Sequence, residues 1–277
     1  RSINQIQKIK LMKRLLLLIA ILVTTAGFSQ EDLFFYSYRH VPADEMELFK
    51  SNEADFWSKV HGNLLRQKKI TGWAMLSRVG GLARDPNIYF FVGVGSFENL
   101  DNMNANYGKA IEEVMSSLDA GAQSKMKERL KQEKFEVGTA MLNRRSTIMR
   151  ENADWDYLVH NYARANNVAG FLDAQDKYFK PFFEEHINAG NTKQVGWITA
   201  GVMNPVGYAY KWNCYTADAF KSMSDIYNAW DDDSIEWPEG AMEEINKTTE
   251  QAGFWKRIIW RKDMWLDEDG NLQVYQN

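Results

Sequence analysis

The segments ITGWAM (70–75) and QVGWIT (194–199) resemble one another, although 124 residues separate their first positions. In both, a Gly-Trp pair opens an apolar, alternating run, the pattern expected of a strand with one buried face. Similar segments at a fixed separation indicate an internal repeat. The regions on either side of the two pairs therefore decide whether the chain holds two copies of one unit.

A helical pattern precedes each Gly-Trp pair, over 43–66 and over 171–187. Apolar side chains fall at helical spacing in both stretches. Near the end of each stretch a histidine, His61 or His186, follows an aromatic residue by four positions. Pro181 lies inside the second pattern, so this helix either kinks there or begins late.

Strands are expected on both sides of these helices, because aromatic and β-branched residues in alternation favour strands. The expected strands are 33–40, 73–78 and 88–94 in the first region and 156–163, 197–203 and 208–215 in the second.

Further pairs of similar segments follow in the same order in both regions. The stretches 100–107 and 220–227 share an apolar residue, a Met and a Tyr at the spacing of one helix face. The last pair, 148–155 and 259–265, shares an apolar pair, an arginine and a closing tryptophan. An additional helix is expected near 119–134.

These pairs of similar segments predict two units of the order β-α-β-β-α-β, at 33–155 and 156–266, with 267–277 as a C-terminal tail. In such a unit four antiparallel strands present one apolar face, and two helices cover it.

A unit of this kind occurring twice resembles the dimeric α/β-barrel superfamily of ferredoxin-like folds. The resemblance implies an α+β class, with two tandem ferredoxin-like units whose antiparallel sheets pack as a pseudo-dimeric α/β barrel. Two separate domains side by side are the alternative. The superfamily includes antibiotic-biosynthesis-type monooxygenases, stress-responsive barrel proteins and haem-binding members. The resemblance rests on the order of elements and identifies no subfamily, so no family residue is assigned a role.

The N-terminal region has the pattern of a secretory signal peptide. Within 12–30, two basic residues precede an apolar run from Leu15 to Val23, and small residues follow. The run is shorter than the roughly 20 residues that a membrane span needs. Residues 1–11 are expected to be upstream, non-native sequence. We therefore expect a bacterial-type exported protein, periplasmic or extracellular, with no membrane attachment after cleavage.

The net charge argues against a nucleic-acid partner, and the cysteine content excludes internal disulfides. Without residues 1–30, 28 basic residues stand against 37 acidic ones, a net charge of −9. Such a surface repels phosphate backbones, so nucleic acid is not an expected partner. Cys214 is the single cysteine, so the chain forms no internal disulfide. Phosphate-loop, nucleophile-elbow and zinc-protease motifs do not occur in the sequence, and no metal site is predicted.

The four histidines are the candidate chemical groups. His40 and His160 fall late in the first strand of each unit and are the predicted catalytic bases, because histidine titrates near neutral pH. His61 and His186, late in the first helices, are the candidate axial ligands if haem is bound. A histidine near a helix C-terminus also interacts favourably with the helix dipole, so a structural role stays open.

The many aromatic residues predict an apolar ligand cavity. Several lie on the expected strands, where their rings could face a flat or hydrophobic molecule. The predicted ligand-binding residues are Tyr38, Trp73, Tyr162, Trp197 and Tyr210.

The sequence thus favours an exported protein that binds a hydrophobic or aromatic small molecule, with cofactor-independent oxidoreductase activity as one form of this function. Haem binding and a non-catalytic interaction or assembly module are the alternatives. No cofactor is predicted in the first case. The chain is expected to be a monomer with pseudo-dimeric halves, or a homodimer.

Overall fold

The computed structural model describes residues 31–131, 135–207, 210–230, 235–251 and 253–276. The expected signal peptide, 12–30, and the segment 1–11 before it lie outside the described residues. Among the residues described, no helix has both the length and the hydropathy needed to cross a bilayer.

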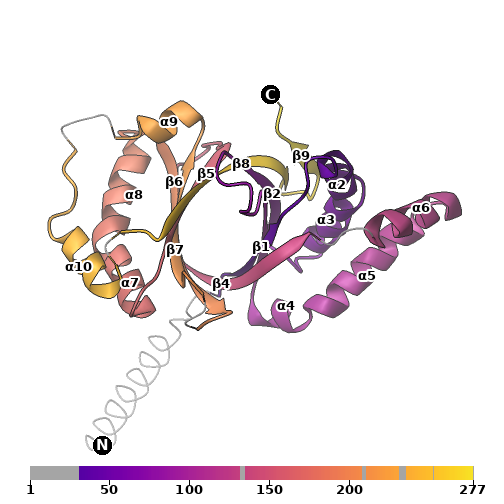
Figure 1. The fold of residues 1–277 in the computed structure, drawn as a ribbon, viewed down its shortest axis with the longest axis horizontal. Coiled ribbons are helices and arrows are strands. Elements are labelled where there is room, and N and C mark those ends of the chain that lie inside the picture. The colour runs from indigo at the N-terminus through magenta and orange to yellow at the C-terminus, as the bar shows by residue number, and fades with distance from the viewer. Residues whose placement is uncertain (1–30, 132–134, 208–209, 231–234, 252, 277) are drawn as a thin grey trace, which may run out of the picture. The chain divides into compact units, whose positions relative to one another are not determined.

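Within the described residues, eight antiparallel strands close into a barrel, and a ninth short strand pairs with the last of them (Figure 1). The order around the barrel is β2-β3-β1-β4-β6-β7-β5-β8, and pairing of β8 with β2 closes it. The strands are β1 (Leu33–Arg39), β2 (Gly72–Arg78), β3 (Ile88–Gly95), β4 (Glu136–Met149), β5 (Tyr157–Ala163), β6 (Gln194–Asn204), β7 (Cys214–Phe220), β8 (Lys256–Leu266) and β9 (Leu272–Val274).

The two halves of the barrel, β1–β4 and β5–β8, have the same order of strands. The first runs β2-β3-β1-β4 and the second β6-β7-β5-β8. The Gly-Trp pairs occupy the same place in both, because Trp73 pairs with Val92 of β3 and Trp197 pairs with Asp218 of β7. The pairings β4–β6 and β2–β8 join both halves into one barrel.

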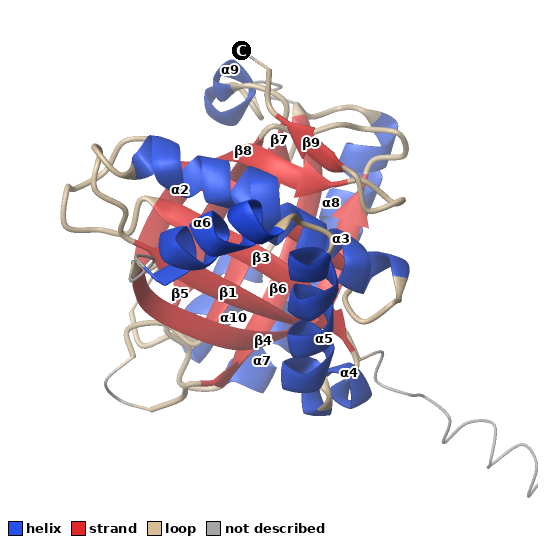
Figure 2. Cartoon of the chain, turned by 90° about the vertical axis from the view of Figure 1, so that its right-hand side faces the viewer, coloured by secondary structure: helices blue, strands red, loops and turns tan. Residues whose placement is uncertain are grey.

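Helices cover the outer face of each half, as Figures 1 and 2 show. The helical segments of the first half are α2 (Met46–Asn52), η1 (Glu53–Trp57), α3 (Ser58–Arg66), α4 (Phe97–Asp101), α5 (Met103–Ser116) and α6 (Ala120–Lys131). Those of the second half are α7 (Val168–Ala174), η2 (Gln175–Phe179), α8 (Lys180–Ala189), α9 (Met223–Tyr227) and α10 (Ala241–Thr248).

A π-helical segment interrupts the first long helix of each half, η1 between α2 and α3 and η2 between α7 and α8. In the second half the helical run begins at Val168, so it does not start late, and Pro181 lies in the first turn of α8, directly after η2. The first half has no proline at this point, so the proline alone does not cause the π segments. Such segments are rare and occur often at functional sites.

Large aromatic side chains fill the interior of the barrel. Alternation along the strands turns Tyr36, Tyr89, His160, Tyr215 and Trp260 inward, and each is 2% exposed or less. Tyr36 stacks on His160 with ring centroids 5.2 Å apart, and the hydroxyl groups of Tyr36 and Tyr215 are hydrogen bonded. The strand faces directed inward therefore form a core.

Three expected boundaries are wrong. The strand expected at 208–215 is β7, Cys214–Phe220; residues 208–209 lie outside the described residues, and exposed Tyr210 belongs to the connection. The stretch 148–155 lies mostly outside regular secondary structure, because β4 ends at Met149. Only Met223–Tyr227 of the helix expected at 220–227 is helical. In each case the prediction followed aromatic residues or the similarity between the two halves, and these did not coincide with the ends of the strand or helix.

The outer helix and the tail agree better with expectation. Helix α6 occupies Ala120–Lys131 of the stretch 119–134, whose last three residues lie outside the described residues. The tail forms a hairpin, because β9 pairs with the end of β8 across a turn that Asp267 holds with its side chain.

Candidate functional site

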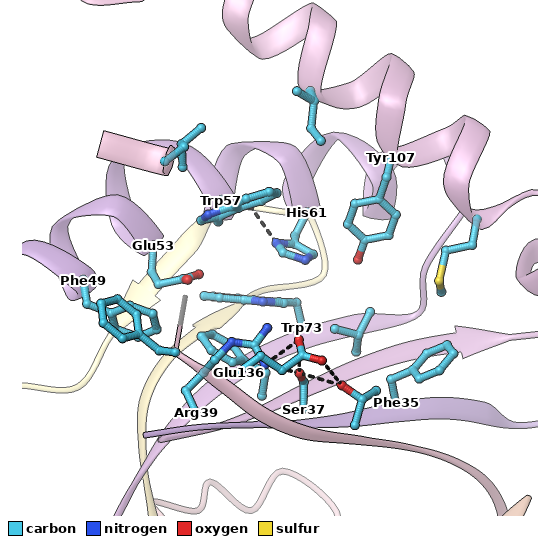
Figure 3. Close-up of a pocket in the computed structure, with 17 residues that line it drawn as sticks. Phe35, Ser37, Arg39, Phe49, Glu53, Trp57, His61, Trp73, Tyr107 and Glu136 are labelled. Atoms are coloured by element: carbon cyan, nitrogen blue, oxygen red, sulfur yellow. Dashed lines mark hydrogen bonds and ion pairs between the residues drawn. The ribbon is translucent and has the colours of Figure 1, made fainter. Parts of the chain in front are cut away.

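A cavity of about 770 Å³ lies between the outer face of the first-half sheet and its helices. We name it the first-half cavity. Figure 3 shows its residues. They come from the sheet and from the helical segments α2, η1, α3, α5 and α6: Phe35, Ser37, Arg39, Trp73, Phe90, Val92, Glu136 and Thr139 on the strands; Phe49, Glu53, Trp57, His61, Met103, Tyr107, Ile111 and Leu130 on the helices; and Phe135 before β4.

His61 is the imidazole among the residues that line this cavity. Its Nδ1 lies 2.7 Å from the backbone oxygen of Trp57, one turn earlier, and a carbonyl can only accept a hydrogen bond. Nδ1 therefore carries the proton, and the lone pair is on Nε2. Burial lowers the pKa of His61 from 6.5 to about 4, so the ring is neutral at neutral pH. Its Nε2 can accept a hydrogen bond from a bound molecule.

Aromatic rings fix the orientation of His61. It stacks on Trp73 with centroids 5.2 Å apart and planes at 23°, and Tyr107 of α5 meets it edge-on at 5.5 Å. Figure 3 shows Trp73 below the imidazole and Tyr107 beside it. The sequence-predicted Trp73 is therefore a wall of this cavity, in contact with the predicted haem ligand His61.

Polar groups lie along the strand side of the cavity. Arg39 Nη1 is 2.9 Å from Glu136 Oε2, and the same guanidinium donates to the hydroxyl of Ser37. Glu53, the first residue of η1, is 6% exposed and lines the cavity from the helix side (Figure 3). The cavity thus combines an apolar body with an acceptor nitrogen and a paired guanidinium.

A second cavity, of about 550 Å³, lies in the matching place of the second half, and we name it the second-half cavity. Trp197 lines it, as Trp73 lines the first. Trp197 stacks on Phe183 of α8 with centroids 5.0 Å apart. Both Phe183 and His61 stand eight residues after the start of their π segments, so Phe183, and not His186, is the counterpart of His61.

Asp218 on β7 is the acidic group of the second-half cavity. Asn161 Nδ2 donates to its Oδ2 at 2.7 Å, and Gln194 Nε2 donates to its Oδ1 at 3.0 Å. Burial raises the pKa of Asp218 to about 6, against the lowering by these amides and by the charge of Arg257. At neutral pH the carboxylate is therefore mainly ionised.

The other predicted residues lie elsewhere. Tyr38 and Tyr162 are in the barrel interior, where their hydroxyl oxygens are 3.1 Å apart. His160 Nδ1 is 2.9 Å from the hydroxyl of Tyr162, and burial lowers the pKa of His160 to about 3. Its Nε2 has no hydrogen-bond partner in the described part of the chain. His160 lines neither of the two cavities.

His40, His186 and Tyr210 are peripheral. His40 follows β1 and places Nδ1 3.2 Å from the backbone oxygen of Asp85. His186 lies in the last turn of α8 against Phe182, with ring centroids 4.6 Å apart. Tyr210 is 44% exposed. None of the three lines either cavity, so the structure brings together His61 with Trp73, and Tyr38 with His160 and Tyr162.

The sequence interpretation missed Asp218, Tyr107 and Glu53. The run CYTADAF (214–220) carried the signal for Asp218, because alternation puts it on the face of Cys214 and Phe220, which helices cover. A carboxylate on an apolar, covered face is unusual. Among the described residues, no group of three or more His, Cys, Asp or Glu side chains is arranged to hold a metal ion.

No protein-family model matches the sequence, and no curated protein matches it either. Several solved structures are similar to this chain in fold. An anthrone oxidase-like protein is 9% identical with a TM-score of 0.50, over 89% of this chain and 94% of that one. A candidate monooxygenase from Lactobacillus acidophilus NCFM is 11% identical with a TM-score of 0.48, over 88% and 96%. A mutant chlorite dismutase from Candidatus Nitrospira defluvii is 9% identical with a TM-score of 0.44, over 87% and 93%.

These likenesses concern the fold. Together with the closed barrel of eight strands, the likeness to the anthrone oxidase-like protein shows that the chain has the dimeric α/β-barrel fold, which confirms the class expected from the sequence. The subfamily is not identified.

Proposed function

We propose that the chain binds a flat, mainly apolar small molecule with a hydroxyl group in the first-half cavity. The observation that carries the proposal is His61: a neutral imidazole on a cavity wall, with Nδ1 held by Trp57 and Nε2 left as an acceptor. Trp73 and the phenylalanines of the wall suit the face of an aromatic ring. Arg39 would meet an electron-rich oxygen at the strand side.

The pKa of His61 decides between hydrogen bonding and proton removal. A group of pKa about 4 that takes a proton from a phenol of pKa about 10 works against roughly 8 kcal/mol. Nε2 is therefore suited to accept a hydrogen bond and to orient the hydroxyl. Binding is the function that the geometry supports best.

Cofactor-independent oxidation is the finer form of this proposal, and the anthrone oxidase-like neighbour suggests a substrate to test. Anthrone and O₂ would give anthraquinone and water, as one CH₂ group becomes a carbonyl and the second oxygen atom leaves in water. An oxygen electrode with anthrone measures this directly, and an uptake rate equal to that of buffer would refute it.

Binding is tested by calorimetry at pH 6 with 7-hydroxycoumarin, a flat molecule with one hydroxyl, and with 7-methoxycoumarin, which cannot donate. We expect the hydroxyl compound to bind roughly tenfold more tightly, the value of one hydrogen bond. His61→Phe introduces the residue of the second half at this position and should remove the preference. His186→Phe is the matched control and should retain it. Equal binding of both coumarins to the wild-type protein would contradict the proposal.

Haem binding through His61 is the second candidate, because an axial ligand needs a free lone pair and Nε2 of this cavity-lining histidine carries one. Bound haem would supply a redox-active iron. Haem titration is expected to give a Soret band that His61→Phe abolishes and His186→Phe retains. Absence of the band in the wild-type protein would eliminate this candidate. If neither coumarin nor haem binds, a non-catalytic interaction module is the remaining one of the functions that the sequence suggested.

We also propose that the two halves arose by duplication of one ferredoxin-like unit. The shared strand order and the matched π segments support this. We further propose that the protein is exported, and that it is a monomer with pseudo-dimeric halves rather than a homodimer. Recovery of the protein outside the cytoplasm tests export, and sedimentation velocity of the recovered protein tests whether it is a monomer.

A further inference from the structure

Asp218 occupies a position that the fold itself does not require to be acidic. It is the cross-strand partner of Trp197, and the partner of Trp73 in the first half is Val92. Thr216, two residues earlier on the same face, corresponds in the same way to Phe90. The same sheet is therefore built with apolar residues in one half, and the polar floor of the second-half cavity needs another reason.

The carboxylate lies beneath an aromatic enclosure. Trp197, Trp230 and Trp237 line the cavity, and the rings of Trp230 and Trp237 are 5.2 Å apart. Trp237 is 52% exposed, so an apolar rim faces solvent. Tryptophan faces attract cations more strongly than other aromatic rings do.

Among the residues that line the second-half cavity, two carry a charge, Asp218 and Arg257. Arg257, opposite Asn161 on β8, is the other charged residue of the lining and is exposed. The lining residues from α7, η2, α8, α9 and α10 are uncharged: Phe171, Gln175, Phe179, Phe183, Ile226, Met242 and Ile245. The two amides on Asp218 occupy one acceptor position on each oxygen, and a carboxylate oxygen has a second one.

We propose that the second-half cavity is a separate binding site for an organic cation, an amine or a quaternary ammonium group attached to an apolar body. Asp218 pairs with the positive charge, and Trp197, Trp230 and Trp237 surround it. The site is distinct from the first-half cavity, so it stands or falls independently of the coumarin experiment.

The test uses benzyltrimethylammonium as the probe and neopentylbenzene, its uncharged analogue of the same shape, as the comparison. Calorimetry at pH 7.5 should show that the cation binds at least roughly tenfold more tightly, because one charge pair inside an aromatic enclosure is worth this much. Asp218→Asn should reduce that ratio to near one. His61→Phe, which alters only the other cavity, should leave it unchanged.

The pH dependence gives a second readout. The charge of a quaternary ammonium ion does not titrate, so its affinity should fall as the pH is lowered through 6, and the affinity of neopentylbenzene should not. Equal affinities of the two probes at pH 7.5 would overturn the proposal. So would an unchanged ratio in Asp218→Asn, or tighter binding of p-cresol than of the cation, which would identify a site for hydroxyl donors.

Discussion

The burial of Asp218 predicts a pH-dependent loss of stability that Asp218→Asn should remove. The pKa of this carboxyl is about 6 in the folded protein, above its ordinary 3.8. A raised pKa means that the folded state binds the proton more tightly than the unfolded state does. The stabilisation is therefore complete below pH 3.8 and is lost as the pH rises through 6. Its full size is about 3 kcal/mol.

The wild type and the variant should be unfolded with urea at pH 7.5 and at pH 5. Linkage predicts that the free energy of unfolding of the wild type, relative to that of Asp218→Asn, is about 1.4 kcal/mol larger at pH 5 than at pH 7.5, so the wild type is relatively more stable at pH 5. The hydrogen bonds that asparagine makes or loses with Asn161 and Gln194 do not depend on pH, so they cancel in this difference. Asp173→Asn, at a carboxylate that is 66% exposed, is the control.

A relative change below about 0.5 kcal/mol between the two pH values would refute the reasoning, because it would mean that Asp218 titrates as it does in the unfolded chain. A change of opposite sign would do the same, since it would show a carboxylate stabilised in its charged form.

Three further outcomes follow from the packing. Tyr162→Phe removes the hydroxyl that contacts His160 and Tyr38 inside the barrel, and urea unfolding should show a loss of about 1–3 kcal/mol, because buried polar atoms lose their partner. Gly62→Ala would place a Cβ 2.5 Å from the backbone oxygen of Gly270 and should lower the melting temperature, whereas Gly108→Ala, in open space on α5, should raise it by reducing the entropy of the unfolded chain. Cys214 is buried and its thiol pKa is raised to about 12, so Ellman's reagent should label it only after denaturation, and labelling of the native protein would contradict the packing.

The repeated order of elements around the two Gly-Trp pairs predicted the fold class, because alternation and helical spacing are local properties that both halves show independently. The closure of the barrel was less accessible, since the pairings of β4 with β6 and of β2 with β8 join segments that no local pattern connects. The strand that corresponds to β7 was predicted too early in the chain, because the aromatic residues before Cys214 resemble a strand more than the segment 214–220 does.

The candidate site was predicted in part. His61 and Trp73 were both predicted as site residues from their residue types. Their contact could not be predicted, because it depends on a helix interrupted by a π segment. The aromatic strand residues were expected to line a cavity, and those directed inward instead form the barrel core. Asp218 was missed because the strand was expected at 208–215, so the alternation that places Asp218 on a covered face of β7 was not considered.

The central claim, a ligand site at His61, is tested most directly by a crystal structure of the protein with 7-hydroxycoumarin. The account predicts the coumarin ring against Trp73, with its hydroxyl oxygen at hydrogen-bond distance, about 2.6–3.2 Å, from Nε2 of His61. Density for the ligand in the second-half cavity or on the surface, with the first-half cavity holding only water, would contradict it.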